Sequence, residues 1–308
     1  MENNKENNFV SAVVYCHDDA PTLVCFVENL DKTLSNHFLK YEIIIVNDGS
    51  IDDSVNYLRQ YASKKEEKNI TLLNMSHYQG IEASMNAGVD LSIGDFVYEF
   101  DQAYVDFDWE MVMNIYHQSL KGYDIVSARA NQPSRLSSRL FYAIFNRYAN
   151  LQYAIGTESF RILSRRAINR IHSISQSIPF RKAAYANCGL SVSQITYTST
   201  ETTKRKLHSD RTSVALDSII LFTDVAYRIT VGLAIIMALA TTTIAFYALI
   251  YKIMSNPVEG WATTVIFMAF GFTGLFIILA MVIKYLQMLV KLSFRKKDYL
   301  FESIEKLQ

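Results

Sequence analysis

The sequence has few cysteines, no net charge and no apolar segment in its first residues. Its 308 residues include three cysteines, Cys16, Cys25 and Cys188. This odd number without metal-site spacing predicts reduced thiols in a cytosolic compartment. The 30 basic and 30 acidic residues balance to a formal charge of +0, so charge gives no reason to expect a nucleic-acid partner, and no nucleic-acid-binding motif is present. Residues 1–8 are polar, which predicts that no signal peptide is present.

Short apolar runs alternate with helical patterns over the first hundred residues. The runs are predicted strands at residues 9–14, 43–46, 70–74 and 95–100. Apolar residues at helical spacing predict helices at 20–34, 52–62 and 80–91. Later strands are expected at 124–127, 160–163 and 195–197. Strands alternating with helices are typical of βαβ units, so the predicted fold class is α/β with a mostly parallel sheet.

The segment YEIIIVNDGSIDDS, residues 41–54, holds the first candidate binding residue. Its apolar run at 43–46 predicts a strand that is buried on both faces. Asp48 follows the carboxyl end of this strand, where open α/β sheets bind their ligands. Asp48 is therefore a candidate to accept hydrogen bonds from a base or a sugar. The alternative is that residues 47–50 are only a turn and that Asp52 is only a helix cap.

Carboxylates follow three of the predicted strands. Asp18 and Asp19 follow the first strand, Asp48 the second and Asp101 the fourth. The carboxyl ends of parallel strands meet at one edge of a sheet, and clustered carboxylates repel each other unless a cation or a donor-rich ligand shares them. The three acidic strand ends therefore predict a ligand site at this edge.

Two long uncharged runs occupy the last hundred residues, from Ile229 to Tyr251 and from Gly260 to Ile283. Each exceeds the ~20 residues that a helix needs to cross a bilayer. Basic residues flank the runs at Lys204, Arg205, Lys206, Arg211, Arg228, Lys291, Arg295, Lys296 and Lys297. The positive-inside rule then predicts that both flanks and both termini are cytoplasmic. We expect a cytoplasmic domain at 1–212 and a membrane domain at 213–308, with transmembrane helices at about 229–251 and 260–284 and a cytoplasmic tail.

Residues 135–153 predict an amphipathic helix with a broad apolar face. Arg135, Arg139 and Arg147 lie outside that face. A basic amphipathic helix with aromatic residues can lie in a membrane interface, and the alternative is a helix packed on the sheet. The two predicted spans favour the interface.

The order of these motifs resembles that of family 2 GT-A glycosyltransferases. The likeness rests on SAVVYCHDDAPTL at 11–23, EIIIVNDGSIDDS at 42–54 and QGIEASMNAGVDLSIGDFVYEFD at 79–101. The two terminal spans are similar to those of the polyprenyl-phosphate branch, the bactoprenol glucosyltransferases and dolichol-phosphate mannose synthases. The resemblance covers nearly the whole chain. It implies a GT-A, Rossmann-like sheet, amphipathic interface helices and two C-terminal transmembrane helices in the inner membrane.

The resemblance also implies an activity and its site residues. The expected reaction transfers a sugar from a nucleotide-sugar, expected to be a UDP-sugar, to polyprenyl (undecaprenyl) phosphate for a cell-surface polysaccharide such as the O-antigen of lipopolysaccharide. The nucleotide-sugar would contact Asp18, Asp19, Asp48, Gly80, Asp101 and Gln102. Catalytic roles fall to Asp101, Asp106 and Arg161, with Asp101 as ligand of Mg²⁺ or Mn²⁺. Because guanidinium groups suit phosphate, the lipid phosphate is assigned to Arg129, Arg135, Arg139, Arg161 and Arg205.

The sequence departs from the family pattern at the metal motif. Ala103 replaces the second metal aspartate, and Ser159 replaces the acidic residue before Phe160. Mg²⁺ can bind through one or two carboxylates plus substrate phosphates, so Asp106 is a candidate second ligand. The family's Gln-x-x-Arg-Trp segment is absent, which argues against a processive polysaccharide synthase. The alternatives are a catalytically impaired pseudoenzyme that binds nucleotide-sugar and a lipid-binding scaffold. A homo-oligomer formed through the spans is also expected.

Overall fold

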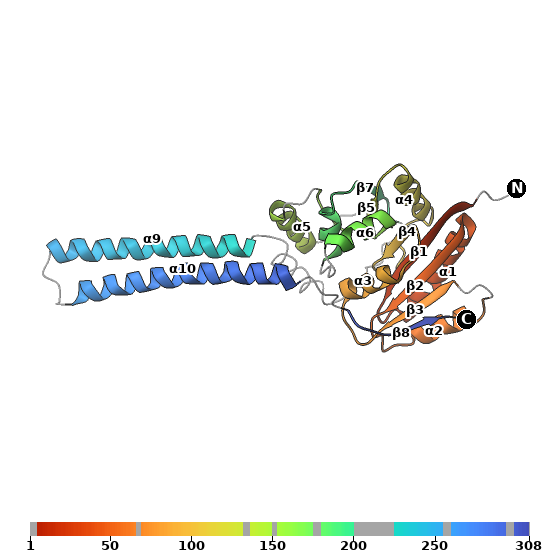
Figure 1. Cartoon of the computed structure of the whole chain (residues 1–308), viewed down its shortest axis with the longest axis horizontal. Coiled ribbons are helices and arrows are strands. Elements are labelled where there is room, and N and C mark those ends of the chain that lie inside the picture. Colours follow the sequence, from red (N-terminus) through yellow and green to blue (C-terminus); the bar gives the residue numbers. More distant parts are fainter. Residues whose placement is uncertain are drawn as a thin grey trace. The chain divides into compact units, whose positions relative to one another are not determined.

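The computed structural model describes residues 5–65, 69–131, 136–149, 153–174, 180–199, 225–254, 260–293 and 299–307. These residues belong to two compact units, drawn together in Figure 1. One unit comprises Met1–Asn146, Leu151–Val214 and Phe294–Gln308, and the other comprises Arg147–Asn150 and Ala215–Ser293. The first unit contains the sheet and the predicted site, and the second contains the two long apolar helices.

A mixed sheet of eight strands forms the centre of the first unit. The strands are β1 (Glu6–Cys16), β2 (Phe38–Asn47), β3 (Ile70–Met75), β4 (Phe96–Phe100), β5 (Ile125–Ala130), β6 (Phe160–Ser164), β7 (Val192–Tyr197) and β8 (Phe301–Lys306). Their order is β7-β5-β6-β4-β1-β2-β3-β8. Only β6 and β8 pair antiparallel to their neighbours. The predicted α/β class with a mostly parallel sheet is therefore confirmed.

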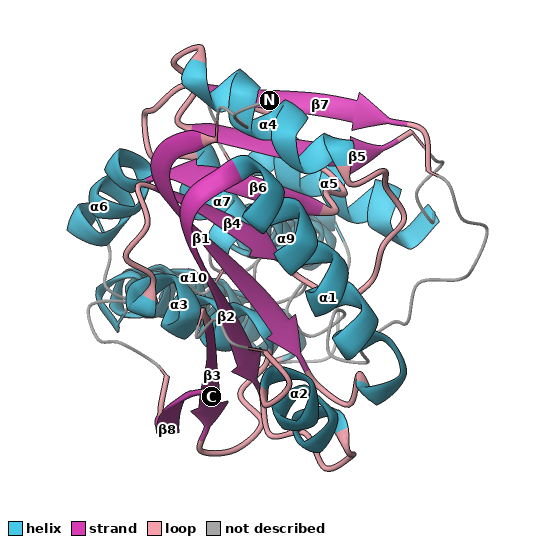
Figure 2. Cartoon of the chain, turned by 90° about the vertical axis from the view of Figure 1, so that its right-hand side faces the viewer, coloured by secondary structure: helices cyan, strands magenta, loops and turns pink. Residues whose placement is uncertain are grey.

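Helices cover both faces of this sheet, because its central strands are buried on both sides. The helices α1 (Ala20–His37), α2 (Ser54–Ala62) and α4 (Glu110–Leu120) pack on one face. The helices α3 (Ile81–Leu91), α6 (Arg165–Ile174) and α7 (Arg181–Ala186) pack on the other (Figure 2). In β2, Ile43 and Ile45 join the first core while Ile44 and Val46 join the second. Because alternate side chains of β2 point into opposite cores, both sets are apolar and the run at 43–46 is apolar throughout.

The strand register brings the carboxyl ends of the parallel strands to one edge. Cys16 of β1 pairs with Asn47 of β2, and Asn47 pairs with Asn74 of β3. On the other side of β1, Val14 pairs with Phe100 at the end of β4. The loops that carry the predicted acidic residues therefore leave the sheet from the same edge.

The predicted amphipathic helix is present as α5 (Leu136–Tyr148). Its Phe145 is fully buried, with its ring centroid 5.6 Å from that of Phe180. Leu140 remains 64% exposed and Tyr148 remains 39% exposed. One side of the helix therefore packs on protein, as one alternative predicted, and the other side carries exposed apolar groups; its contact with a membrane interface stays a prediction.

The strand β8 was not anticipated from the sequence. It lies antiparallel to β3, with Thr71 opposite Lys306 and Leu73 opposite Ile304. Its six residues occupy an edge of β3 that would otherwise present unpaired backbone groups.

The second unit consists of α9 (Val225–Met254) and α10 (Trp261–Ser293), which run side by side in Figure 1. Segments 231–254 and 263–286 have mean hydropathies of 2.2 and 2.6 and are long and apolar enough to cross a membrane. The hydroxyls of Thr241 and Thr273 lie 2.9 Å apart between the two helices. The two predicted C-terminal apolar helices are thus present.

Candidate active site

Two predicted nucleotide-site carboxylates shape the turn after β1, and that of Asp18 also connects it to the turn after β2. Asp18 has a φ of 53°, and its Oδ1 accepts hydrogen bonds from the backbone of Ile51 at 2.8 Å and Asp52 at 3.2 Å. The Asp19 carboxylate accepts from the backbone N–H of His17 at 3.2 Å. Both carboxylates therefore fix the shape of the loops at the shared edge.

Asp48 is fully buried, and its carboxylate accepts hydrogen bonds from groups of the same chain. Oδ2 accepts hydrogen bonds from the Tyr15 hydroxyl and the Gly80 backbone, both at 2.9 Å, and Oδ1 accepts from the Gln79 backbone at 2.8 Å. Burial, followed by the charge of Asp48, raises the pKa of Tyr15 far above its ordinary value, so this phenol remains a donor. Asp48 thus holds the chain directly before α3.

Asp101, at the end of β4, lies between two buried arginines. Its Oδ2 accepts from Arg161 Nη2 at 2.9 Å, and its Oδ1 accepts from Arg181 Nη2 at 2.8 Å. Arg161 is 0% exposed and Arg181 is 1% exposed. Both arginines also lie close to Glu99, with Arg161 Nη1 at 2.6 Å and Arg181 Nη1 at 3.0 Å from its Oε2. The structure thus joins two predicted residues, Asp101 and Arg161, to two that the sequence reasoning missed.

Two further carboxylates complete this cluster, which we call the Asp101 network. Arg161 Nε donates to Glu158 at 3.2 Å, and Arg181 Nε donates to Glu82 at 3.1 Å. Burial alone would raise the pKa of Asp101, but the charges of Arg161 and Arg181 outweigh it and hold that pKa well below its usual range. Asp101 is therefore ionised at neutral pH.

The residues around Asp101 do not fit the divalent-cation site that the sequence predicted. Both Asp101 oxygens already accept from guanidinium groups, and Ala103 is buried without a ligating atom. The candidate second ligand, Asp106, accepts a hydrogen bond from Tyr197 at 2.6 Å, and Tyr197 Oη lies 2.5 Å from Ser159 Oγ. Within the described part of the chain, no three His, Cys, Asp or Glu side chains group as a metal site.

Two cationic side chains meet at the loop that precedes β6. Lys182 Nζ donates to the Gly156 carbonyl at 3.1 Å. The Arg129 guanidinium lies against the same glycine, because a Cβ added to Gly156 would be 3.2 Å from Arg129 Nη1. The charge of Lys182 also contributes to the low pKa of Asp101. Arg129 was predicted from the sequence. Lys182 was not, because no sequence motif marks a lysine that simply follows an arginine.

The remaining predicted residues are placed as follows. Gln102 is buried beside Asp101 in the chain, Gly80 caps α3 with a φ of 87°, and Arg139 is exposed on α5. Arg135 and Arg205 lie outside the described residues. Glu99 did give a signal in the sequence, since a carboxylate inside an apolar strand needs a charged partner when it is buried.

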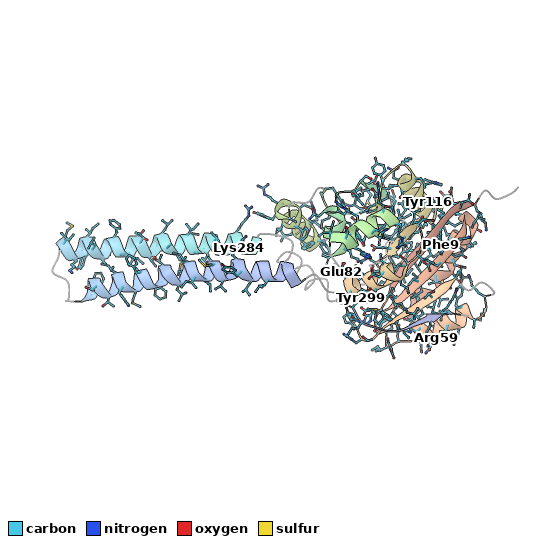
Figure 3. All side chains as sticks on the ribbon, viewed as in Figure 1. Phe9, Arg59, Glu82, Tyr116, Lys284 and Tyr299 are labelled. Atoms are coloured by element: carbon cyan, nitrogen blue, oxygen red, sulfur yellow. The ribbon has the colours of Figure 1, made fainter. Side chains whose placement is uncertain are left out.

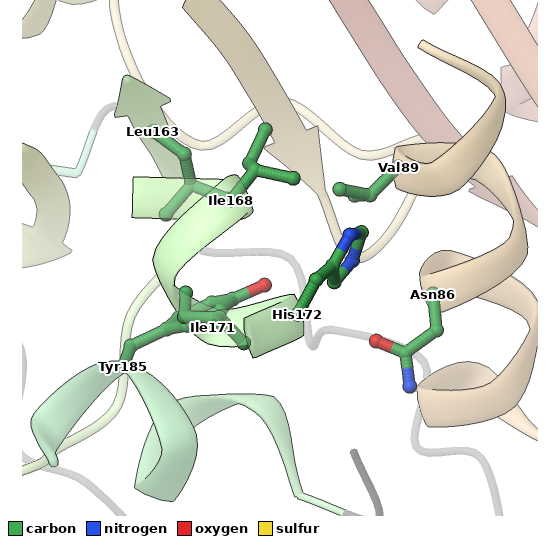
Figure 4. Close-up of a pocket in the computed structure, with 7 residues that line it drawn as sticks. All are labelled: Asn86, Val89, Leu163, Ile168, Ile171, His172 and Tyr185. Atoms are coloured by element: carbon green, nitrogen blue, oxygen red, sulfur yellow. The ribbon is translucent and has the colours of Figure 1, made fainter. Parts of the chain in front are cut away.

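A small pocket on the α3 and α6 face of the sheet is separate from these residues. In Figure 4, His172 on α6 points toward Val89 and Asn86 on α3. His172 Nε2 also lies 2.9 Å from Asp90 Oδ1. The pocket leaves about 10 Å³ of space, which suits one water molecule rather than a nucleotide.

Comparison with known proteins identifies the first unit. The family model for glycosyl transferase family 2 matches residues 11–172, more than half of the chain. The putative glycosyltransferase CsbB of Bacillus subtilis (strain 168) is 23% identical over 262 residues, which cover 82% of this chain and 78% of that protein. The undecaprenyl-phosphate 4-deoxy-4-formamido-L-arabinose transferase of Aeromonas hydrophila is 27% identical over 124 residues, which cover 40% of this chain and 37% of that protein.

A solved structure supports the same fold. The mannosyltransferase PcManGT from Pyrobaculum calidifontis, in complex with GDP-Man and Mn²⁺, has a TM-score of 0.51 and 15% sequence identity. The match covers 65% of this chain and 59% of that chain. At this identity the likeness shows the GT-A-like fold alone. This chain spans less than two thirds of both the mannosyltransferase and the arabinose transferase.

Proposed function

This chain belongs to glycosyl transferase family 2 and is a glycosyltransferase, and we propose that it transfers a sugar from a nucleotide-sugar to polyprenyl phosphate. The observation that carries this proposal is the combination of a GT-A-like sheet with two helices long and apolar enough to cross a membrane. A sheet of this fold suits a water-soluble donor, and the apolar helices would keep it beside a membrane-embedded acceptor. The relative from Aeromonas hydrophila, which is named for undecaprenyl phosphate, supports this choice of acceptor.

The donor is assigned to the edge where β1, β2 and β4 end. Asp18, Asp19 and Asp48 fix the loops there, and Gly80 begins the helix beside them. Gln102 follows Asp101 at the same edge. We take the donor to be a UDP-sugar and the final product to be a cell-surface glycan such as an O-antigen.

Two cations of this chain suit the acceptor phosphate. An ionised phosphate is already a nucleophile, so the protein needs only to align it with the donor and to neutralise charge. Arg161 is committed to three carboxylates, whereas Arg129 and Lys182 are half-buried beside Gly156. We therefore assign the lipid phosphate to Arg129 and Lys182. Asp101 is assigned no metal ion in this reaction, because its oxygens already bind guanidinium groups.

A transfer assay in membranes tests this proposal. Radiolabelled UDP- and GDP-sugars are offered with undecaprenyl phosphate, and the lipid-linked product is extracted and counted. Arg129→Gln and Lys182→Gln should each raise the KM for the lipid by about 10- to 100-fold, the loss of one charge-assisted hydrogen bond. Lys121→Gln, at the exposed end of α4, is the matched control and should leave the KM unchanged.

A second candidate function follows from Ala103 and from the occupied carboxylate of Asp101. A pseudoenzyme would bind a nucleotide-sugar without transferring the sugar. Calorimetric binding of UDP or GDP together with no labelled lipid from any donor would favour this function. A homo-oligomer formed through the apolar helices stays a prediction.

A further inference from the structure

The segment after α10 returns to the sheet and contacts the loop before α3. The Leu300 carbonyl accepts a hydrogen bond from the Ser76 backbone at 3.1 Å. The Leu300 N–H donates to Gln79 Oε1 at 2.8 Å, and Gln79 Nε2 donates back to the Leu300 carbonyl. The Gln79 side-chain amide therefore pairs with the Leu300 peptide group as a neighbouring strand would.

The same loop, residues 76–80, is held from its other side by the carboxyl end of β2. The backbone N–H groups of Gln79 and Gly80 donate to the two oxygens of Asp48. Gly49, with a φ of 63°, approaches so closely that an added Cβ would lie 2.9 Å from Tyr78 N. The loop thus lies between the predicted nucleotide-site motif and the C-terminal segment.

Hydrogen bonds, rather than buried apolar groups, determine the conformation of this loop. Ser76, His77 and Tyr78 are exposed, and the Tyr78 ring contacts that of His17 at 4.5 Å between centroids. A segment with few buried apolar contacts opens locally at low free-energy cost. Removing the bonds from Leu300 should therefore loosen the loop while the sheet remains folded.

The strand β8 is well anchored to act on the loop. Asn74 Nδ2 donates to Ser303 Oγ at 3.0 Å, and Arg59 pairs with Glu305 at 3.0 Å. Tyr299 donates a hydrogen bond to Asp90 of α3, and both Arg59 and Tyr299 are labelled in Figure 3. The anchoring groups come from α2, β3 and α3, so Leu300 has a fixed position against the sheet.

We propose that Leu300 and Gln79 are positioning residues of the donor site. Leu300 aligns the Gln79 side chain, and the Gln79 and Gly80 backbones then orient Asp48 and the start of α3 for the nucleoside diphosphate part of the donor. This role rests on the proposed function. It also makes donor binding dependent on residues 299–306, which follow the second apolar helix in the sequence.

Two variants of the full chain test this role. In Gln79→Ala the side-chain pair is lost, and in a chain that stops after residue 298 the whole strand is lost. We expect UDP or GDP, titrated by calorimetry, to bind about tenfold more weakly to both. The KM for the donor should rise by a similar factor, while the KM for undecaprenyl phosphate stays unchanged. The matched control is Gln118→Ala on α4, which loses two side-chain hydrogen bonds, one donated to Ser193 at 3.2 Å and one accepted from Lys121 at 3.1 Å.

Hydrogen–deuterium exchange separates failure of this proposal from failure of the proposed function. In the free protein, the amides of Gln79 and Gly80 should exchange at least tenfold faster in Gln79→Ala than in the wild type or in Gln118→Ala. Unchanged exchange, or unchanged nucleotide binding, would overturn the proposal. If the shortened chain does not fold, the results for Gln79→Ala alone decide whether the positioning role holds. If the wild type binds neither nucleotide, the proposed function fails and the exchange rates still decide the positioning role.

Discussion

Asp101 and its two arginines share one buried site, where each charge depends on the others. A buried ion pair adds little net stability, but removal of one partner typically costs about 3–5 kcal/mol because the other charge stays buried. We expect Asp101→Asn to lower the free energy of unfolding by about this amount. Denaturant unfolding followed through Trp109, whose ring lies 5.5 Å from that of Phe26, would measure it. Asp53→Asn, on an exposed cap, is the control and should change little.

The difference in stability between the wild type and Asp101→Asn has a predictable pH dependence. The pKa of Asp101 in the folded protein lies below its ordinary value of about 3.9, so folding favours the charged form. The stability from Asp101 is therefore complete above about pH 4 and falls as the pH drops below that value. The difference in unfolding free energy between the wild type and Asp101→Asn should shrink between about pH 4 and pH 3. A difference that stays constant over this range would contradict the arginine assignment.

Metal affinity gives a second measurement on the same residue. Without donor, we expect no saturable Mn²⁺ binding below the millimolar range, because few ligands are present and Asp101 is shared by Arg161 and Arg181. Ala103→Asp adds a carboxylate at this point and should tighten Mn²⁺ binding. Isothermal titration of both proteins would measure the Mn²⁺ affinities. Micromolar binding by the wild type would show that Asp101 gives up its hydrogen bonds to the two arginines when the metal binds.

At the scale of elements, helices and strands with a clear apolar period could be predicted, and elements that depend on a partner could not. The alternation over residues 9–100 predicted β1 to β4 with the helices between them. By contrast, β8 is short, mostly exposed and partly charged, and it is a strand because β3 offers an edge. Arg181 was missed for a similar reason, since its importance comes from Glu99 and Asp101 and from no spacing near it in the sequence.

The helix α5 allows a prediction at this scale. Phe145 is fully buried against Phe180, while Leu140 on the same helix is 64% exposed. Truncating a buried Phe costs about 3–5 kcal/mol. Phe145→Ala should therefore destabilise the first unit by about this amount in denaturant unfolding, and Leu140→Ala should have little effect. If Leu140→Ala instead weakens binding of the protein to anionic lipid vesicles, the exposed side of α5 contacts the membrane interface, as the sequence predicted.

For the whole molecule, the C-terminal strand provides an argument about topology. Because β8 pairs with β3 in one sheet, residues 301–306 and the rest of that sheet must lie on the same side of a membrane. An even number of crossings would satisfy this requirement, and α9 and α10 are two helices long and apolar enough to cross. From the basic residues Arg228 and Lys291, the positive-inside rule predicts that this side is the cytoplasm.

A labelling experiment tests this topology with a native residue as its control. Cys25 is exposed in the sheet unit, whereas Cys16 is buried and burial raises the pKa of its thiol to about 12. In intact cells that make Glu259→Cys, a membrane-impermeant maleimide should label position 259 between the helices and leave Cys25 unlabelled. After permeabilisation Cys25 should react as well. Labelling of Cys25 in intact cells, or of position 259 only after permeabilisation, would reverse the orientation and remove the catalytic unit from cytosolic nucleotide-sugars.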